Sequence, residues 1–419
     1  MLLRCYPKLT DWIFFLFNQN PAADYRFLPI YSYGFCVAAA FLAAASLAVA
    51  EMRRREKLGL LNGTEGEITI GEPPKLLELL FTVLIGFTIG YKLIGIFTYH
   101  EELRTAQLQF STFMTGGSIG NLLDKALSFY KYGNWIGGIL VAAGLGYYYY
   151  WSRNKQKLAV PLLKKIMIYP SDSIGDLVVI AALLGISGSA FFNFLEDPAA
   201  YKDFWQDPIG SLFSGLSIYG GLICAGAGFV AFAYVKKFHL GHFLDSIAPG
   251  FILANGIGRL GCQIAGDGDW GIDNLHAKPA LIPQFLWSSH YAHNIINADP
   301  TNPIPGCVEE HCWQLANAVY PTPIYEFLMC GAIFLILWAL RKRLTYKPGT
   351  VFTIFMILIG IQRYTIEQIR SISDRNLYHV FGFGFRQSEL ISFGMIIVGV
   401  GVTAYLLNRY RHSMSKLVN

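Results

Sequence analysis

The chain has 419 residues, of which 53% are hydrophobic and 15% are charged. Ordinary soluble proteins carry roughly 25% charged residues, and the mean hydropathy here is +0.39. This composition excludes an ordinary soluble enzyme and indicates a protein of the lipid bilayer. The net charge of +5 is small, and the basic residues stand in short clusters between apolar runs. Nucleic acid is therefore not an expected partner.

The first 29 residues contain an apolar run at 12–17 that is too short to cross a membrane. No small-residue cleavage site follows it, so a signal peptide is not expected. We expect residues 1–29 to form either a helix at the membrane interface or an unstructured terminal segment.

Apolar runs of about 20 residues cross the roughly 30 Å of hydrocarbon in a bilayer as helices. Alternating segments of about 10 residues, typical of a barrel, do not recur. The sequence therefore predicts an all-α polytopic integral membrane protein with a transmembrane domain at 30–408. Nine runs qualify as spans: 30–50, 77–98, 133–151, 173–193, 217–235, 246–263, 325–340, 350–369 and 389–408.

Lysine and arginine are concentrated in alternate loops between these runs. Cytoplasmic loops are the ones enriched in these residues. This pattern predicts an N-terminus outside, a C-terminus inside and a cytoplasmic tail at 409–419. The basic clusters lie at 53–57, 153–165, 236–237, 341–347 and 409–416.

The longest outer segment, 266–323, is the one stretch able to form an extracytoplasmic cap. It contains Cys307 and Cys312. In an oxidising compartment we expect a disulfide between them. The alternative is a metal site with Glu309 or His311, but it lacks a second pair of ligands.

Residues 134–155 and 217–237 resemble each other, because each has an outer Gly-Gly pair, a small-residue helix and a basic inner end. Each follows a glycine-rich span. A duplicated helix pair would explain both, and the alternative is that small residues simply suit helix packing in lipid.

Charged residues inside spans are costly and mark candidate functional sites. Arg259 lies near the outer end of the sixth predicted span, and Arg363, Glu367 and Arg370 share one face of the eighth. Two guanidinium groups at headgroup depth suit an anion such as a lipid phosphate. Because Glu367 can neutralise only one arginine, we expect bound lipid to neutralise the other. Structural ion pairing is the alternative, and for Arg370 outward snorkelling is favoured.

Two acidic residues, Asp267 and Asp269, follow Arg259 in a glycine-rich turn. They could bind a cation, but turn-forming acids are the preferred interpretation.

Five motifs now point to a known family: SGLSIYGGLICAG, DSIAPG, GIGRLGCQIAGDGDWG, PTPIYE and IGIQRYTIEQIR. In order and spacing they resemble the prolipoprotein diacylglyceryl transferases. The resemblance runs from about Ser173 to Arg411, with a further match around Tyr33.

This resemblance implies a seven-span enzyme of the bacterial inner membrane that opens to the outer leaflet. It would take phosphatidylglycerol, a membrane lipid, and a prolipoprotein with a lipobox cysteine, forming a thioether and releasing glycerol phosphate. This is the first step of lipoprotein maturation, and no metal or cofactor is required. The two surplus spans predict an inserted helix pair at 52–170. The residues that match family positions are Tyr33, Arg259, Gly271, Tyr325, Glu326, Arg363, Glu367 and Arg370.

The chain also departs from the family pattern. Tyr219 precedes Gly220 and Gly221 where the family has His-Gly-Gly. A tyrosine, with a pKa near 10, is a poor base, so Tyr219 is expected to position the headgroup. The family's glutamate is matched by Asp267, or less well by Asp269. The family's asparagine is replaced by Cys262, its later histidine by Tyr320 and its later glutamine by Pro323.

The identity of the proton acceptor stays open: either Glu367 accepts the proton, or the precursor thiol ionises in the field of the arginines alone. A transporter is the main rival function, but transporters place their sites at mid-bilayer between repeated, broken helices. The second rival is an inactive homologue that binds lipid or precursor without turnover, because two family histidines are missing.

Overall fold

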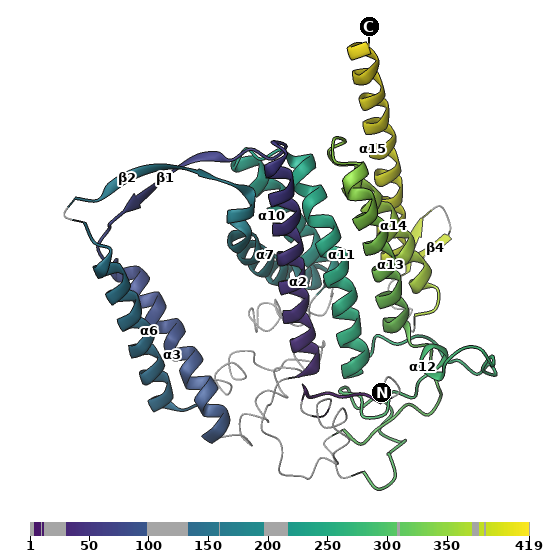
Figure 1. Ribbon diagram of the computed structural model, residues 1–419. Coiled ribbons are helices and arrows are strands. Elements are labelled where there is room, and N and C mark those ends of the chain that lie inside the picture. Colours follow the sequence, from purple (N-terminus) through teal and green to yellow (C-terminus); the bar gives the residue numbers. More distant parts are fainter. Residues whose placement is uncertain are drawn as a thin grey trace.

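The computed structural model describes residues 4–9, 11, 31–98, 133–158, 160–196, 217–307, 311–370, 377–380 and 383–418. The described part is mostly helical (Figure 1). Each range in which the sequence predicts a span carries a helix. In chain order these are α2 (Ser32–Lys57), α3 (Leu76–Thr98), α6 (Trp135–Lys155), α7 (Ile174–Glu196), α10 (Ile218–Val235), α11 (Leu240–Ala265), α13 (Thr322–Arg343), α14 (Thr350–Glu367) and α15 (Gln387–Val418).

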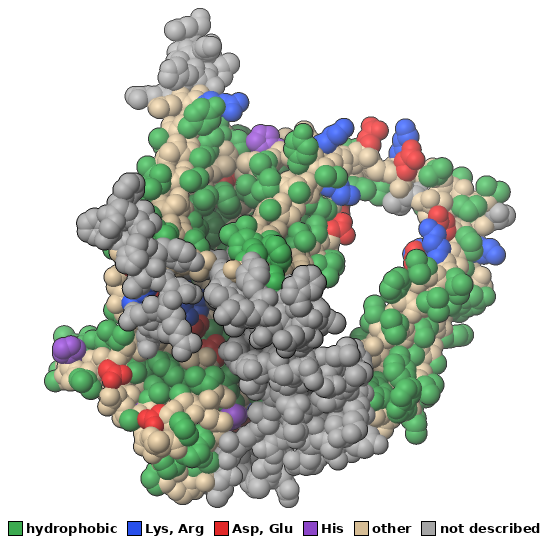
Figure 2. Space-filling model, turned by 180° about the vertical axis from the view of Figure 1, so that it is seen from behind, with side chains coloured by type: hydrophobic (Ala, Val, Ile, Leu, Met, Phe, Trp, Pro, Cys, Tyr) green, Lys and Arg blue, Asp and Glu red, His purple; other side chains and the backbone are tan. Residues whose placement is uncertain are grey.

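Within the described residues, five helical segments are long and apolar enough to cross a membrane: Ser32–Lys57, Pro170–Leu195, Thr322–Arg343, Thr350–Glu367 and Gln387–Tyr410. Hydrophobic side chains cover much of the helical surface in Figure 2, as lipid contact requires. The chain is therefore a polytopic membrane protein. The full set of nine spans and their orientation stay predictions.

A central bundle places α11 between α2 and α13, and α14 then packs against α13 and α15. Glycines allow the close approaches. A Cβ added at Gly250 of α11 would lie 2.8 Å from the carbonyl oxygen of Ala44 on α2, and one at Gly256 would lie 2.9 Å from the Cβ of Cys330 on α13. Small residues at such crossings let van der Waals packing hold the helices together in lipid.

The α3–α6 and α7–α10 pairs pack in the same register. The Asn134 amide donates to the Tyr91 carbonyl (2.9 Å), and the Ser217 amide donates to the Ser189 carbonyl (2.9 Å). Just before each acceptor stands a glycine, Gly90 or Gly188, that faces a glycine of the partner helix. This shared geometry is what a duplicated helix pair would produce.

The C-terminal end of α2 and the N-terminal part of α11 enclose a buried charged cluster. The Arg55 guanidinium, fully buried, lies 3.1 Å from Glu51 and 3.6 Å from Asp245, and 2.8 Å from Nδ1 of His242. Asp245 accepts hydrogen bonds from the amides of Gly349 (2.9 Å) and Phe352 (2.8 Å) at the start of α14. The DSIAPG motif thus joins α2, α11 and α14 at this end of the bundle.

Two short antiparallel ribbons add to the all-α architecture expected from sequence. Strand β1 (Thr64–Ile70) pairs with β2 (Leu162–Ile168), and β3 (Leu377–Val380) pairs with β4 (Phe383–Arg386). The pairing partners of the first ribbon are 92 to 104 positions apart in the sequence, so no local hairpin signal predicts it. In Figure 1 this ribbon joins the α3–α6 pair to the rest of the molecule.

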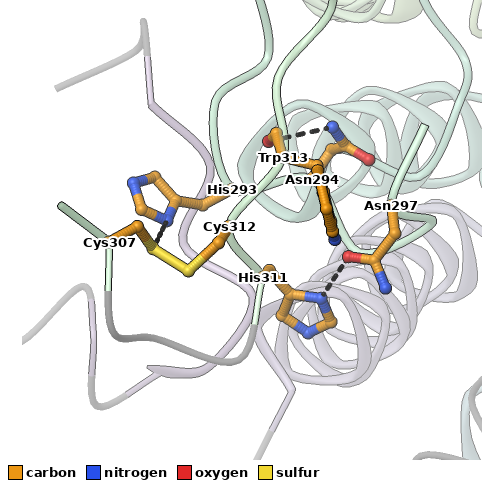
Figure 3. Close-up of a disulfide and its surroundings, with 7 residues drawn as sticks. All are labelled: His293, Asn294, Asn297, Cys307, His311, Cys312 and Trp313. Carbon is orange, nitrogen blue, oxygen red and sulfur yellow. Dashed lines mark hydrogen bonds between the residues drawn. A yellow bond between two sulfur atoms is a disulfide. The ribbon is translucent and has the colours of Figure 1, made fainter. Parts of the chain in front are cut away.

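The segment after α11 forms a cap built from loops, isolated bridges and the short helix α12 (Gln284–Trp287). The predicted disulfide between Cys307 and Cys312 is confirmed, with Cα atoms 5.6 Å apart. The bonded sulfurs offer no thiolate pair for the alternative metal site, and Nδ1 of His311 lies 3.1 Å from the side-chain oxygen of Asn297 (Figure 3). Glu309 lies outside the described residues.

The first described residues, 4–8, contact the cap and the end of α11, so they do not form the unstructured segment that was one alternative for the N-terminus. The Cys5 amide donates to Ala292 (2.8 Å) and the Tyr6 amide to Ile264 (2.6 Å). Both side chains are buried. The apolar run at 12–17 lies outside the described residues, so its interfacial placement stays a prediction.

Candidate functional site

Three arginines and three carboxylates form one continuous chain of ion pairs where the cap meets α11, α13 and α14. The order along the chain is Arg370, Asp269, Arg259, Glu326, Arg363 and Glu367. Basic and acidic groups alternate, so the formal charges cancel when all six are ionised. We call these six residues the ion-pair network.

The two glutamates of the network lie deepest. Glu326 on α13 accepts from Arg259 (Nε to Oε2, 3.1 Å) and faces Arg363 (Nη1 to Oε1, 3.4 Å). Glu367 lies 3.2 Å from Nη2 of Arg363 one helical turn away. The side chains of Glu326 and Glu367 are 3% and 2% exposed, whereas the two arginines are 12% and 19% exposed. The guanidinium groups therefore form the accessible side of the network.

Asp269 links the cap to the helices because its carboxylate pairs with both Arg259 and Arg370. Its position is fixed by the turn that follows α11. Gly266 ends that helix in the left-handed conformation (φ 68°), which glycine adopts without steric cost. The Thr322 hydroxyl at the start of α13 donates to the Asp269 carbonyl at 2.6 Å.

Gly271, the last residue of the motif GIGRLGCQIAGDGDWG, lies where the backbone leaves no room for a side chain. A Cβ there would lie 2.6 Å from the carbonyl oxygen of Ile369 and 2.9 Å from the Cβ of Tyr320. The Gly271 amide donates to the Tyr320 carbonyl (2.8 Å), and Gly271 forms a bridge with Arg370. The glycine thus lets the cap backbone lie directly against the end of α14.

Two expectations about these charges are wrong. Glu367 is not the sole neutralising group, because Glu326 and Asp269 also pair with the arginines. Arg370 does not snorkel away from the protein; it binds Asp269. Sequence reasoning failed because Arg259 and Glu326 lie 67 positions apart, and nothing local shows that they meet.

Of the two acidic residues in the turn after α11, Asp269 belongs to the ion-pair network and Asp267 does not. Burial alone would raise the pKa of Asp269, but the charges of Arg259, Arg370 and Arg363 outweigh it and lower that pKa. Burial and the neighbouring Asp269 charge raise the pKa of Asp267 to about 6. The Asp267 carboxylate accepts the Asp269 amide at 3.3 Å.

Two tyrosine candidates, Tyr33 and Tyr325, contact elements that carry the network. Tyr33 on α2 packs against α11, 3.4 Å from a Cβ built at Gly261, two residues from Arg259. The Tyr325 hydroxyl donates to the Leu286 carbonyl of the cap (2.6 Å) and so fixes the cap on α13.

The segment Tyr219-Gly220-Gly221 lies where α10 packs against α7. A Cβ at Gly221 would lie 2.9 Å from the Gly185 carbonyl oxygen, and Gly220 faces the Gly188 carbonyl. Tyr219 occupies the first turn of α10, but its side chain lies outside what the structure describes. Both glycines therefore have a packing role, whatever their contact with substrate.

Cys262, Asp267 and Asp269 offer possible ligand atoms within 4.8 Å of one another. Asp269 already pairs with two guanidinium groups. Their positive charges disfavour a cation at the same carboxylate, so this cluster carries no metal proposal.

Sequence reasoning missed Arg386, which precedes α15. Its Nη1 donates to the Glu367 carbonyl at 2.7 Å, at the C-terminal end of α14. A cation there complements the negative end of the helix. The only available signal was a basic residue beside an expected span, which is too common to single out.

The family comparison agrees with this geometry. The model of the family described as prolipoprotein diacylglyceryl transferase matches residues 123–405, well over half of the chain. The chain belongs to this family. It is therefore a membrane transferase of lipoprotein biosynthesis, and all six residues of the ion-pair network lie inside the matched range.

Three curated relatives bear the name phosphatidylglycerol–prolipoprotein diacylglyceryl transferase. The protein of Corynebacterium efficiens is 29% identical over 229 residues, 54% of this chain and 65% of the relative. That of Corynebacterium glutamicum is 27% identical over 242 residues, 57% and 70%. That of Streptococcus pyogenes is 27% identical over 232 residues, 55% and 77%. The match thus spans about two thirds to three quarters of each relative.

Proposed function

We propose that this chain transfers the diacylglyceryl group of phosphatidylglycerol to the lipobox cysteine of a prolipoprotein in the bacterial inner membrane. The observation that carries the proposal is the ion-pair network: three arginines held by three carboxylates at one end of α11, α13 and α14. In the proposed orientation that end faces the outer leaflet.

The lipid phosphate is proposed to bind on the arginine side of the network. Arg259 directs Nε to Glu326 and Nη1 to Asp269, and a guanidinium carries five N–H donors in a planar fork. The six charges of the network cancel one another. A bound phosphodiester adds one negative charge, which Arg259 and Arg363 can share. Charge-assisted hydrogen bonds of this kind are shorter and stronger than neutral ones.

The reaction itself is a displacement at carbon. The precursor thiolate attacks the carbon of the diacylglyceryl group that is bonded to the phosphate oxygen. The C–S bond forms, the C–O bond breaks, and glycerol phosphate leaves with the bonding electron pair. Negative charge grows on the leaving phosphate. Arg259 and Arg363 are placed to stabilise it, and their field also favours ionisation of the incoming thiol.

Of Asp267 and Glu367, Asp267 is the better candidate for the group that accepts the thiol proton. Glu367 is buried and holds Arg363, so its protonation would break an ion pair. Asp267 makes no ion pair among the described residues, and its pKa, raised to about 6 by burial and by Asp269, suits a base near neutral pH. We assign Tyr219 to headgroup positioning, together with Tyr33 and Gly220.

The wider organisation completes the proposal. Nine spans would cross the bilayer with the N-terminus outside, the cap 266–323 would cover the outer side, and 52–170 would be an inserted helix pair. Its shared packing register with α7–α10 supports a duplication.

The test is a transfer assay with purified protein, phosphatidylglycerol and a lipobox peptide. We expect a mass increase of one diacylglyceryl group on the peptide and equimolar release of glycerol phosphate. Arg259→Lys should abolish transfer, because lysine keeps the charge but loses the fork that spans two acceptors. Arg153→Lys is the matched control, since Arg153 pairs with Glu78 at 3.2 Å but is 45% exposed. Peptide binding without transfer would instead support an inactive homologue.

A further inference from the structure

The β1–β2 ribbon presents two chemically different faces. Residues directly opposite each other in an antiparallel pair lie on the same face, and the faces alternate along each strand. Ile70 opposes Leu162, and Gly66 and Thr64 oppose Ile166 and Ile168. Together with Lys164, these positions form what we call the aliphatic face.

The opposite face is charged. It carries Glu65, Glu67 and Lys165, with Leu163 and Met167 as its apolar members. Figure 2 shows acidic and basic side chains gathered on the arch that joins the α3–α6 pair to the rest of the molecule. The ribbon is thus amphipathic across its thickness, with one charge on the aliphatic face and three on the other.

A ribbon of two strands needs support from something else. An isolated two-stranded hairpin is marginally stable in water unless a third strand or a helix covers it. In the described part of the chain, β1 and β2 form a sheet of two strands and share an extended interface only with each other. On the aliphatic face Leu162 is 61% exposed and Ile70 is 39% exposed.

The position of the ribbon identifies what covers that face. β1 connects α2 to α3, and β2 connects α6 to α7, so both strands run between the ends of helices that the sequence predicts as membrane spans (Figure 1). The last turn of α2 carries Arg54, Arg55 and Lys57, as expected at a membrane boundary. The ribbon therefore continues the lipid-facing surface of the helices at the level of the headgroups.

We propose that the aliphatic face of the β1–β2 ribbon is a membrane-binding surface. Its isoleucine and leucine side chains enter the leaflet on the inner side, and Lys164 binds the phosphate of an anionic lipid there. The charged face is turned to the cytoplasm. The ribbon thereby fixes the α3–α6 pair relative to the bundle, with which that pair shares no extended helix-to-helix interface among the described residues.

Neighbouring positions on opposite faces give a matched test. Among the described free cysteines only Cys224 is not buried, so a Cys224→Ser background accepts one new thiol for a polarity-sensitive nitrobenzoxadiazole probe. Leu162→Cys and Ile70→Cys report on the aliphatic face. Leu163→Cys and Thr69→Cys, their neighbours, report on the charged face. All variants are placed in nanodiscs containing spin-labelled lipid.

We expect blue-shifted emission and at least threefold stronger lipid quenching at Leu162→Cys and Ile70→Cys than at their neighbours. Equal quenching of both faces, or quenching of the charged face alone, overturns the proposal. A blue shift without lipid quenching, lost at one chain per nanodisc, would show that a second copy covers the face and would overturn it equally.

The charge contribution is tested separately. Lys164→Gln should reduce quenching at Leu162→Cys in nanodiscs that contain phosphatidylglycerol and leave it unchanged in phosphatidylcholine alone. Lys165→Gln, on the charged face, should have no such effect. If both lysine variants behave alike, Lys164 binds no lipid phosphate and that part of the proposal fails. Quenching needs no turnover, so these outcomes are independent of the proposed transferase reaction.

Discussion

Replacing Glu326 with glutamine tests whether the ion-pair network depends on its central carboxylate. Glu326 holds Arg259 at 3.1 Å and Arg363 at 3.4 Å. Hydrogen bonds to charged groups contribute about 1.5–3 kcal/mol each, and glutamine keeps one neutral acceptor. Losing one interaction and weakening the other should cost about 3 kcal/mol, in line with the roughly 3–5 kcal/mol for breaking a buried pair.

Thermal unfolding in detergent, with and without phosphatidylglycerol, measures this effect. Glu326→Gln should lower the unfolding temperature, and the lipid should stabilise the variant more than the wild type, because its phosphate supplies the missing negative charge. Glu78→Gln is the matched control: that glutamate pairs with Arg153 on the surface, where ion pairs contribute about 0–1 kcal/mol. A Glu326 variant as stable as the control, or one that lipid does not rescue, would refute the charge-balance reasoning.

Four further predictions concern the same site and the topology. Arg363→Lys should lower kcat at least 100-fold in the transfer assay while the protein still inserts; near-normal turnover would remove the planar fork from the mechanism. Turnover should rise as pH increases through about 6, where Asp267 loses its proton, and Asp267→Asn should flatten that limb; an unchanged profile would exclude Asp267 as acceptor. Gly271→Ala should cost about 1–3 kcal/mol of stability by overpacking, and wild-type melting would contradict the close approach. A cysteine near Asn302 should react in intact spheroplasts and one near Arg153 only after permeabilisation; the reverse labelling would invert the proposed orientation.

The helices could be predicted from sequence because each depends on a local property, an apolar run of about 20 residues. The cap disulfide was also predictable, since Cys307 and Cys312 are five positions apart in a segment expected to face an oxidising compartment. The β1–β2 ribbon was not. Its strands pair residues such as Ile70 and Leu162, which are 92 positions apart, and each strand alone is too short and too mixed in pattern to stand out.

The candidate site was predicted residue by residue but not as a network. Intramembrane charge identified Arg259 and Arg363 without any contact information, because an arginine in a span is costly wherever it lies. Which carboxylates neutralise them depends on helix packing. Glu326 reaches both arginines only because α13 lies against α11 and α14, and Asp269 rather than Asp267 meets Arg370 only because the turn after Gly266 directs it there.

Comparing the α3–α6 pair with the α7–α10 pair shows which residues of α10 are needed for packing and which are not. Aligning Asn134 with Ser217, the residues whose amides make equivalent hydrogen bonds, places Ile136 of α6 opposite Tyr219 of α10. The Gly-Gly pair is present in both helices, but the residue before it is polar in α10 and aliphatic in α6. Glycine pairs alone therefore account for helix contact and do not predict a site. The position before Gly220 is where a chemical requirement beyond packing would act, so the positioning role proposed for Tyr219 is separable from the packing role of Gly220 and Gly221.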